Sequence, residues 1–165
     1  MTGTWLLAGF LVWIVLAIAY LDGLRRVLKA REHAVAWDLS LLEDCAEAWR
    51  QSLEGLGRRE WREAATSVGR ALEVLAGDES LKEKVQISTE IGLLLREDEA
   101  ESRGAEVGLA LVRERASELD RVLEQLEGDV ADYNLSAADA TFACGRFPLS
   151  LLSLAVGLRA QPVFD

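Results

Sequence analysis

The sequence predicts an all-α protein in which an N-terminal transmembrane helix is followed by an elongated antiparallel bundle of three or four long helices. The first observation behind this prediction is the stretch Thr4–Leu21, which carries no charged side chain. The second is that both prolines, Pro148 and Pro162, lie near the end of the chain. The third is an apolar seam that repeats every seven residues in the second half, which is typical of a long helix packed against others.

Residues 1–22 are predicted to form a membrane anchor. As an α-helix, Thr4–Leu21 would span roughly 27 Å, close to the ~30 Å hydrocarbon thickness of a bilayer. Backbone groups in lipid must pair within the segment, so a single span has to be helical. Trp5 and Tyr20 stand near its two ends, where amphipathic rings prefer the headgroup level, and Trp13 lies within it.

Two other interpretations of this segment compete with a retained anchor. A buried core helix could be equally apolar, but rarely on every face. A secretory signal peptide is the stronger alternative, because Ala17-Ile18-Ala19 has the form of a cleavage site. Such peptides start with a basic region, and residues 1–4 offer only the α-amino group. We therefore favour a retained anchor over cleavage behind Ala19.

The charge distribution predicts the orientation of the anchor. The segment Asp22–Arg31 sums to +3, and with a net charge of −10 for the chain this leaves −13 for the rest. Positive residues that follow a span favour keeping that side in the cytoplasm, so we expect the N-terminus outside and the bulk of the chain in the cytoplasm. Such an acidic chain argues against nucleic acid as a partner. The basic residues are Arg25, Arg26, Lys29 and Arg31.

Residues 23–165 are predicted to form one helical domain, because helix formers dominate and only glycines interrupt them. The first expected stripe continues from the anchor and stops at Gly55-Leu56-Gly57; it consists of Val27, Ala30, Ala34, Trp37, Leu41, Cys45 and Ala48. The second ends at Gly77 and consists of Trp61, Ala64, Ala65, Val68, Leu72 and Leu75. The third consists of Leu81, Val85, Ile91, Leu94 and Leu95.

Three further features mark the expected ends of the helices. We expect Asp78 to cap the third helix. The acidic run Glu97–Glu101 and Gly104 predict a bend or loop before the last long helix. The seam of that helix consists of Ala105, Leu109, Val112, Ala116, Leu119, Leu123, Leu126, Val130, Tyr133, Ala137, Ala140, Cys144 and Phe147.

No residue set in the chain is typical of catalysis, of a metal site or of cofactor binding. His33 is the single histidine, and the Glu-x-x-His pairs of carboxylate-bundle metal sites are missing. The segment Gly55–Glu60 lacks the Lys-Ser/Thr of a phosphate loop, so it is interpreted as a helix break. Cys45 and Cys144 form no CxxC and are expected to be small apolar side chains in helices. The sequence therefore predicts a protein without enzyme activity, metal or cofactor.

The last part of the chain carries a spaced series of short motifs. Tyr133-Asn134 lies seven residues before Ala140-Thr141, which lies seven before Phe147-Pro148. Gly157-Leu158-Arg159 follows, and the sequence finishes with Phe164-Asp165. This series resembles the tail of the LemA family of bacterial membrane proteins, which has YN, YN, FP, Gly-Phe-Lys and Phe-Glu in this order. The first YN and the FP are intact here, and the other motifs are altered.

The resemblance implies an N-terminal membrane helix, a LemA-like helical bundle and the inner membrane of a bacterium. Val35-Ala36-Trp37 sits where the family often has a Val and an Ala-Trp pair. The family's Arg-Arg-x-Asp-Leu and Pro-Asn-Leu element is missing from Leu42–Trp49. Because the family has no general biochemical activity, the resemblance implies a scaffold or assembly factor that acts through protein contacts.

The tail also has a physical interpretation of its own. Pro148 should end the last long helix, because it lacks a backbone donor and clashes with the preceding turn. The apolar segment Leu149–Leu158 is too short to cross a bilayer. It could cap the end of the bundle or lie in the membrane interface, and we favour the cap because interfacial helices usually have a charged face. Phe164 would then fill the same apolar end.

The partners expected from these patterns are the lipid bilayer and an unidentified protein. The acidic surface would suit a basic partner and would be repelled by anionic lipid. Self-association is left open, since Ala8 and Gly9 are small but the span has no GxxxG. The alternative function is a secreted or periplasmic helical module released by cleavage behind Ala19.

Overall fold

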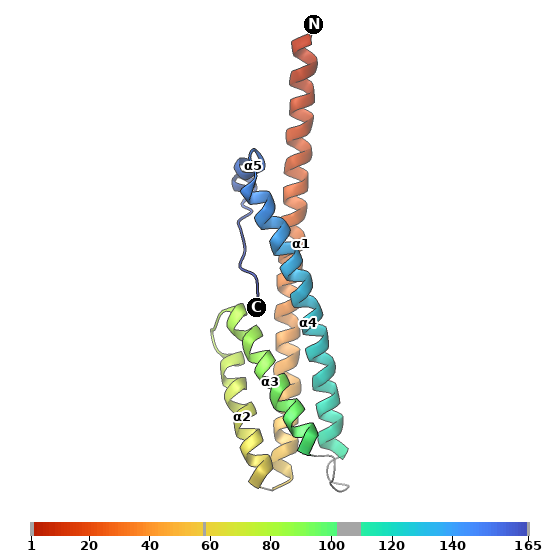
Figure 1. Cartoon of the computed structure of the whole chain (residues 1–165), viewed down its shortest axis with the longest axis vertical. Coiled ribbons are helices and arrows are strands. Elements are labelled where there is room, and N and C mark those ends of the chain that lie inside the picture. Colours follow the sequence, from red (N-terminus) through yellow and green to blue (C-terminus); the bar gives the residue numbers. More distant parts are fainter. Residues whose placement is uncertain (1, 58, 102–109, 165) are drawn as a thin grey trace. The chain divides into compact units, whose positions relative to one another are not determined.

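The computed structural model describes residues 2–57, 59–101 and 110–164, with side chains for 5–57, 61–96 and 110–164. Within these ranges the chain forms five helices and no strand (Figure 1). The all-α prediction is therefore confirmed. The helices are α1 (Thr2–Gly55), α2 (Arg59–Ala76), α3 (Leu81–Glu101), α4 (Ala110–Gly145) and α5 (Leu149–Val156).

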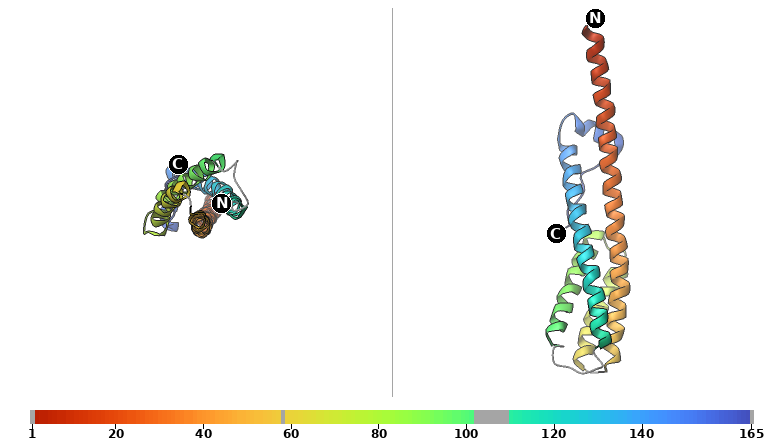
Figure 2. Two further views of the ribbon diagram at one scale, coloured as in Figure 1. Left: turned by 90° about the horizontal axis from the view of Figure 1, so that it is seen from below. Right: turned by 90° about the vertical axis from the view of Figure 1, so that its right-hand side faces the viewer.

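Helix α1 is a single uninterrupted helix of 54 residues, which the right-hand view of Figure 2 follows along its length. It contains no proline, and it ends where the sequence predicts. The Leu56 N–H donates to the Leu53 carbonyl at 3.2 Å, and Gly57 has a φ of +68°. Glycine adopts that left-handed conformation without strain, so Gly55-Leu56-Gly57 terminates the helix as expected.

The chain divides into two compact units, and α1 and α4 contribute to both. The first unit comprises Met1–His33 and Val130–Val163. The second comprises Ala34–Asp129 together with Phe164–Asp165.

In the second unit, neighbouring helices make pairwise contacts. The Gln125 amide of α4 donates to Asp38 of α1 at 2.7 Å. Cys45 lies seven residues further along α1, and Glu118 lies seven residues back along α4. Burial and then the negative charge of Glu118 raise the pKa of the Cys45 thiol. These two segments therefore run antiparallel. Helices α2 and α3 pack against each other and are also antiparallel (Figure 1).

Two glycines mark further contacts in this unit. A Cβ at Gly69 of α2 would lie 3.6 Å from Cδ of Arg50 on α1. A Cβ at Gly92 of α3 would lie 3.6 Å from Cδ1 of Leu123 on α4. These contacts link α1 to α2 and α3 to α4.

The start of α3 corrects one prediction. Ser80 caps this helix in place of Asp78, because Ser80 and Glu83 stand at the spacing of a capping box. The Ser80 N–H donates to Oε2 of Glu83 at 2.8 Å, and the Glu83 N–H donates to Oγ of Ser80 at 3.4 Å. Helix α2 ends at Ala76, directly before Gly77, as predicted.

The end of α3 corrects a second prediction. The acidic run Glu97–Glu101 was expected to form a bend or loop, but α3 continues through it to Glu101. Glutamate and alanine are good helix formers, and this local preference favours a continued helix. Gly104 lies outside the described residues.

The buried face of α1 corrects a third prediction. Trp37 and Val27 of the expected stripe are 70% and 49% exposed, and Ala30 is exposed as well. Ala34, Leu41, Cys45 and Ala48 are half-buried. The buried set lies about one position further along and contains larger apolar side chains, whose burial removes more apolar area from water. It consists of Leu28, Val35, Leu39, Leu42, Ala46, Trp49 and Leu53.

The stripes predicted for the other helices are largely confirmed. Trp61, Ala65, Val68, Leu72 and Leu75 are buried in α2, and Val85, Ile91 and Leu95 in α3; Ala64, Leu81 and Leu94 are half-buried. In α4 the buried seam residues are Val112, Ala116, Leu119, Leu123, Leu126, Tyr133, Ala137 and Ala140, and Val130 and Cys144 are half-buried. Ala105 and Leu109 lie outside the described residues.

Phe147 departs from the seam of α4, since its side chain is 81% exposed. The reason is that α4 ends at Gly145, so the seven-residue phase no longer applies two residues later. Pro148 does separate two helices as predicted, because it is the N-cap residue of α5.

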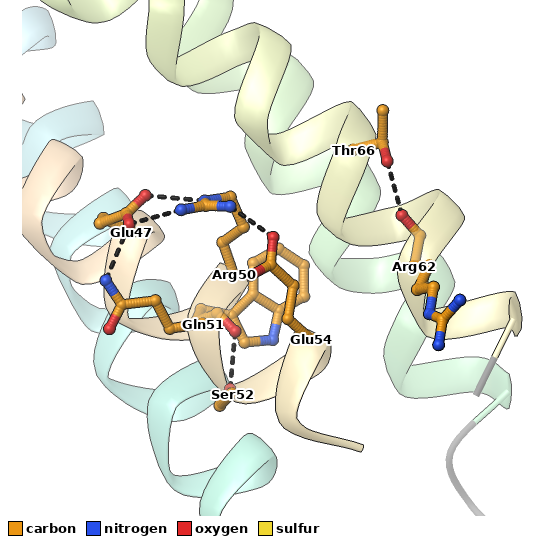
Figure 3. A network of polar contacts seen from close by, with 8 residues as sticks. Glu47, Arg50, Gln51, Ser52, Glu54, Arg62 and Thr66 are labelled. Atoms are coloured by element: carbon orange, nitrogen blue, oxygen red, sulfur yellow. Dashed lines mark hydrogen bonds and ion pairs between the residues drawn. The ribbon is translucent and has the colours of Figure 1, made fainter. Parts of the chain in front are cut away.

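A network of polar side chains covers one side of α1 near its end (Figure 3). Arg50 donates to both carboxylate oxygens of Glu47, at 2.8 and 2.7 Å, and also binds Glu54. Hydrogen bonds from Arg50 and Gln51 lower the pKa of Glu47 to about 2. Partly exposed pairs of this kind, three or four residues apart, contribute little to stability, so the network is part of a solvated helix face.

Candidate membrane interface

Among the described residues, α1 is the one helix that is long and apolar enough to cross a membrane, and its N-terminal part belongs to the first unit. Only 11% of its most apolar window is buried, which does not fit a core helix of this chain. Large apolar side chains instead project into the surroundings along the whole predicted span. They are Trp5, Leu6, Leu7, Phe10, Leu11, Val12, Trp13, Val15, Leu16, Ile18 and Tyr20.

The aromatic side chains of the span lie on its exposed surface. Trp5 and Tyr20, near the two ends, are exposed. Trp13 is 40% exposed and stacks on Phe10, with ring centroids 6.3 Å apart and an interplanar angle of 16°. Their positions therefore agree with rings that contact lipid rather than protein.

The basic residues after the span differ in their contacts. Arg25 donates from Nη1 to the backbone carbonyl of Val156 at 2.8 Å, 131 residues away along the chain. Arg31 forms an ion pair with Asp132 of α4 at 2.9 Å. Arg26 pairs with Asp22 on the same helix face, and Lys29 is exposed. Thus Arg25 and Arg31 hold the unit together, a role that the charge pattern did not reveal.

The Tyr133-Asn134 motif lies within α4 of this unit. Tyr133 is buried, as the seam predicts, and Asn134 is half-buried. Burial raises the pKa of the Tyr133 phenol, and the negative charge of Glu32 on α1 raises it further. Tyr133 therefore serves as a packed side chain of the first unit.

Gly157 is the residue that ends α5. It has a φ of +71°, and the N–H groups of Gly157 and Leu158 donate to the carbonyls of Leu154 and Ser153, at 3.1 and 2.9 Å. These two bonds form the Schellman arrangement, in which a left-handed residue satisfies the last free carbonyls of a helix. The glycine of the Gly157-Leu158-Arg159 motif thus has a backbone reason to be glycine, and Leu158 is buried behind it.

The segment Leu149–Leu158, expected to cap the end of the bundle, is buried over part of its surface. Leu158 and Ser153 are buried, but Leu151 and Leu154 are 61% and 70% exposed. Phe164 is buried as well; it is grouped with the second unit, whereas Leu158 belongs to the first.

A buried carboxyl group in the second unit was missed by the sequence analysis. Asp38 is buried, and burial together with a hydrogen bond from its carboxyl group to Asp129 raises its pKa to about 6. The one indication of this buried carboxyl group in the sequence is that an acidic residue stands beside apolar core positions. Its partners Gln125 and Asp129 follow about ninety residues later, which no local pattern reveals.

The polar groups of the described residues do not form a recognisable catalytic constellation. Within these residues, no three His, Cys, Asp or Glu side chains lie close enough together to hold a metal ion. His33 is exposed, and Cys45 and Cys144 are both free thiols. A groove between α3 and α4 has a mainly acidic rim, formed by Asp120, Glu124 and Glu127 with Arg96 opposite.

Comparisons with protein-family models, curated proteins and solved structures found no match to this chain.

Proposed function

We propose that this chain is a single-pass membrane protein of the LemA type that presents an acidic helical bundle to the cytoplasm. It acts as a scaffold or assembly factor through protein contacts, without catalysis of its own. The observation that carries this proposal is the exposed apolar surface between Trp5 and Tyr20, followed directly by a basic segment. A surface this apolar is costly in water and stable in a bilayer.

The contacts of the second unit support the bundle. Each of its four helical segments contacts the next one in space. Helix α1 meets α2 at Arg50 and Gly69, and α3 meets α4 at Gly92 and Leu123. Helix α4 meets α1 through the hydrogen bond from Gln125 to Asp38. Helix α2 packs on α3. This order of contacts supports the proposed arrangement, an antiparallel bundle of four helical segments around one apolar core.

The groove between α3 and α4 is the surface that we assign to a basic protein partner. Gly92, Leu93 and Leu123 line it together with the acidic residues Asp120, Glu124 and Glu127. Apolar side chains beside carboxylates combine contact area with electrostatic steering. The same carboxylates repel nucleic acid.

Extraction of membranes from expressing bacteria with alkaline carbonate tests the anchor. We expect the full chain to remain in the membrane pellet, and the variant Leu11→Lys with Val15→Lys to be released, since each central lysine costs about 3 kcal/mol in a span. Protease added to intact cells should leave the domain uncut, and protease added to inverted vesicles should digest it. Release of the unaltered chain by carbonate, or digestion in intact cells, would overturn the proposal.

A secreted or periplasmic module remains the second candidate, because Ala17-Ile18-Ala19 has the form of a cleavage site. Against it, Ala17 is buried within an uninterrupted helix. The intact mass of the purified mature protein separates the two candidates. A chain that starts at Tyr20 favours the secreted module, and a chain that retains residues 5–20 favours the anchor.

Crosslinking in intact cells followed by mass spectrometry tests the partner surface. We expect crosslinks from the α3/α4 groove to a protein with a basic surface, and their loss in the charge-reversal variant Asp120→Lys with Glu124→Lys. The matched control is Glu43→Lys with Asp44→Lys, which reverses two carboxylates on α1 instead. Equal crosslinking in all three proteins would exclude the groove as the partner site.

A further inference from the structure

Helix α5 presents an apolar surface that no described segment covers. Leu151, Leu154 and Ala155 are exposed and lie on one side of this short helix, and Phe147 is exposed just before it. The opposite side is used for packing, since Ser153 and Leu158 are buried. Helix α5 therefore packs one side on its own unit, with Ser153 buried and Leu152 and Val156 half-buried, and exposes apolar side chains on the other side.

The contacts of the first unit place α5 beside the end of the membrane span. The Val156 carbonyl accepts a hydrogen bond from Arg25, four residues beyond Leu21, which is about 6 Å along the helix axis. Side chains of a helix lean toward its N-terminus, so the Arg25 guanidinium lies closer still to the span. Both views of this unit show α5 next to α1 (Figures 1 and 2).

The burial pattern of α1 gives a second indication of how close the rest of the first unit comes to the bilayer. Ala17 and Leu21 are buried, although both belong to the last turns of the predicted span. A helix on its own does not bury a leucine completely, so another segment of the first unit must cover this side. Apart from α1, that unit consists of residues 130–163. Part of this segment therefore reaches the level at which the hydrocarbon of the bilayer begins.

The charges around α5 suit a membrane surface. From Ala140 to Phe164 the charged side chains are Arg146 and Arg159, one on each side of α5. The Arg146 guanidinium lies 3.9 Å from the centroid of the Phe142 ring, which is also exposed. Lys29 adds an exposed cation from α1 of the same unit, whereas Arg26 is paired with Asp22. Cations beside apolar side chains are typical of segments that lie in the headgroup region of anionic membranes.

We propose that α5, with Phe147 and the flanking Arg146 and Arg159, docks into the surface of the same bilayer that α1 spans and prefers anionic lipid there. This inference rests on the proposed membrane anchor, because α1 sets the depth of α5. The segment is a second membrane contact, which fixes the orientation of the first unit at the headgroup level. A second copy of the chain that met this surface with the same segment would bring Arg146 and Arg159 of the two copies together, so cations would face cations.

A fluorescent label in the full-length protein tests this proposal. The native thiols are first removed as Cys45→Ala and Cys144→Ser, and the protein is reconstituted into vesicles of phosphatidylcholine with phosphatidylglycerol. An environment-sensitive dye is then attached to a single cysteine at Leu154→Cys, Leu135→Cys or Phe10→Cys. Leu135 is the matched control, because it is 68% exposed in the same unit, against 70% for Leu154. Phe10 reports on the span itself.

We expect the label at residue 154 to emit at shorter wavelength than the label at residue 135 and to be quenched by lipids brominated near the headgroup. The label at residue 10 should be quenched by lipids brominated along their acyl chains. Quenching at residue 10 without quenching at residue 154 by either lipid overturns the docking of α5 and leaves the anchor intact. Absence of quenching at both residues 10 and 154 by either lipid overturns the anchor, and the docking of α5 falls with it. A shift at residue 154 that scales with protein density and not with brominated lipid assigns the surface to a second copy, which also overturns the proposal.

A separate double variant tests the preference of α5 for anionic lipid. Arg146→Gln with Arg159→Gln should lose the difference in quenching at residue 154 between vesicles with phosphatidylglycerol and vesicles of phosphatidylcholine alone. The control Arg113→Gln with Arg121→Gln, on α4 of the second unit, should retain it. An unchanged difference in the first variant would show that these two arginines do not recognise anionic lipid.

Discussion

Asp38 is a carboxyl group that folding places in an unfavourable environment. It is buried on α1, and Gln125 and Asp129 of α4 are its polar neighbours. Burial, and then the neighbouring Asp129, raise its pKa from 3.8 to about 6. A protonated Asp38 can donate to Asp129, whereas an ionised one leaves two carboxylates side by side with one amide donor between them.

The first prediction concerns the pH dependence of stability. Between about pH 4 and pH 6 the unfolded Asp38 loses its proton while the folded one keeps it, so the free energy of unfolding should fall as pH rises through this range. Two pKa units correspond to about 3 kcal/mol. Asp38→Asn should abolish this loss and, at pH 7, raise the free energy of unfolding by about 1–3 kcal/mol. Urea unfolding of the full chain in detergent micelles, followed by circular dichroism, measures both effects.

The control for this prediction is Asp44→Asn, which makes the same exchange at an exposed position of α1. It should leave the pH profile of the wild-type protein unchanged. If Asp38→Asn destabilised the protein at pH 7, the fold would require an ionised carboxylate at this position, and the pH effect described above would be wrong.

The contacts of single residues are also the part of the structure that the sequence predicted least. The exposed aromatic residues Trp5, Trp13 and Tyr20 could be identified from composition, because they stand in an uncharged stretch and no distant partner is needed to recognise them. The contacts of Asp38 with Gln125, and of Arg25 with Val156, join residues 87 and 131 positions apart. Only the folded chain brings these residues together. Neither the burial of the Asp38 carboxyl group nor the hydrogen bond that holds α5 to α1 could therefore be predicted from the spacing of residues in the sequence.

At the scale of an element, α1 shows how two neighbouring apolar stripes compete. The stripe with Trp37 was predicted to be buried, and the stripe with Trp49 is the one that is. Trp49→Ala should lower the free energy of unfolding by about 3–5 kcal/mol, since it leaves a large cavity in the second unit. Trp37→Ala should change it by less than about 0.5 kcal/mol. Thermal and urea unfolding of both variants checks the difference.

This pair is its own control, because the same residue type is removed from two sides of one helix. Trp49 is fully buried and Trp37 is 70% exposed. Comparable losses in the two variants would mean that the side of α1 with Trp37 is covered as well, for example by a partner, and a concentration series would then reveal association.

The cap of α3 provides a second prediction at this scale. Ser80→Ala removes the hydroxyl group that exchanges hydrogen bonds with Glu83, and should lower the free energy of unfolding by about 1 kcal/mol. The bonds to Ser80 also lower the pKa of Glu83, so this part of the stability is present above the ordinary pKa of glutamate. It is lost as pH falls through the lowered value. Urea unfolding at neutral and acidic pH measures the change.

Ser117→Ala is the matched control for Ser80→Ala. Ser117 is exposed within α4, and its hydroxyl group donates to the Glu114 carbonyl of its own helix. Because alanine is the better helix former, this substitution should be neutral or slightly stabilising. An equal loss in both variants would mean that the cap does not stabilise α3 in particular.

The existence of the helices could be predicted from the sequence. Which side of each helix is buried could be predicted only in part. Prolines at the end of the chain and glycines at 55, 57 and 77 predicted where α1 and α2 stop, because these residues act through their own backbone. The buried side of α1 could not be chosen in the same way, since two stripes one position apart are both apolar. The decision depends on which stripe offers more large side chains to α4, and that is a property of the packed pair.

For the whole molecule, the separation of charge along the chain is the feature that a membrane would sense. The span is uncharged, the next ten residues carry +3, and the remainder is strongly acidic. We argue that the cations near the span, and not the acidic remainder, set the orientation, because positive residues close to a span dominate topology and carboxylates contribute little. The sequence alone predicts this much, but not that Arg25 and Arg31 have a second role in packing.

The last prediction uses this division of roles to reverse the orientation without disturbing the fold. Arg26→Gln and Lys29→Gln remove the cations that do not hold the unit together, and Thr2→Lys with Thr4→Lys places two cations before Trp5, at the N-terminal end of the span. A fraction of the molecules should then insert with the domain outside, where protease added to intact cells would digest it. The control Arg62→Gln with Lys82→Gln removes two cations that are far from the span in the sequence, and it should insert like the wild-type protein. If the redistributed charges left every domain protected, the topology would be fixed by the folded domain rather than by the positive residues after α1's apolar part.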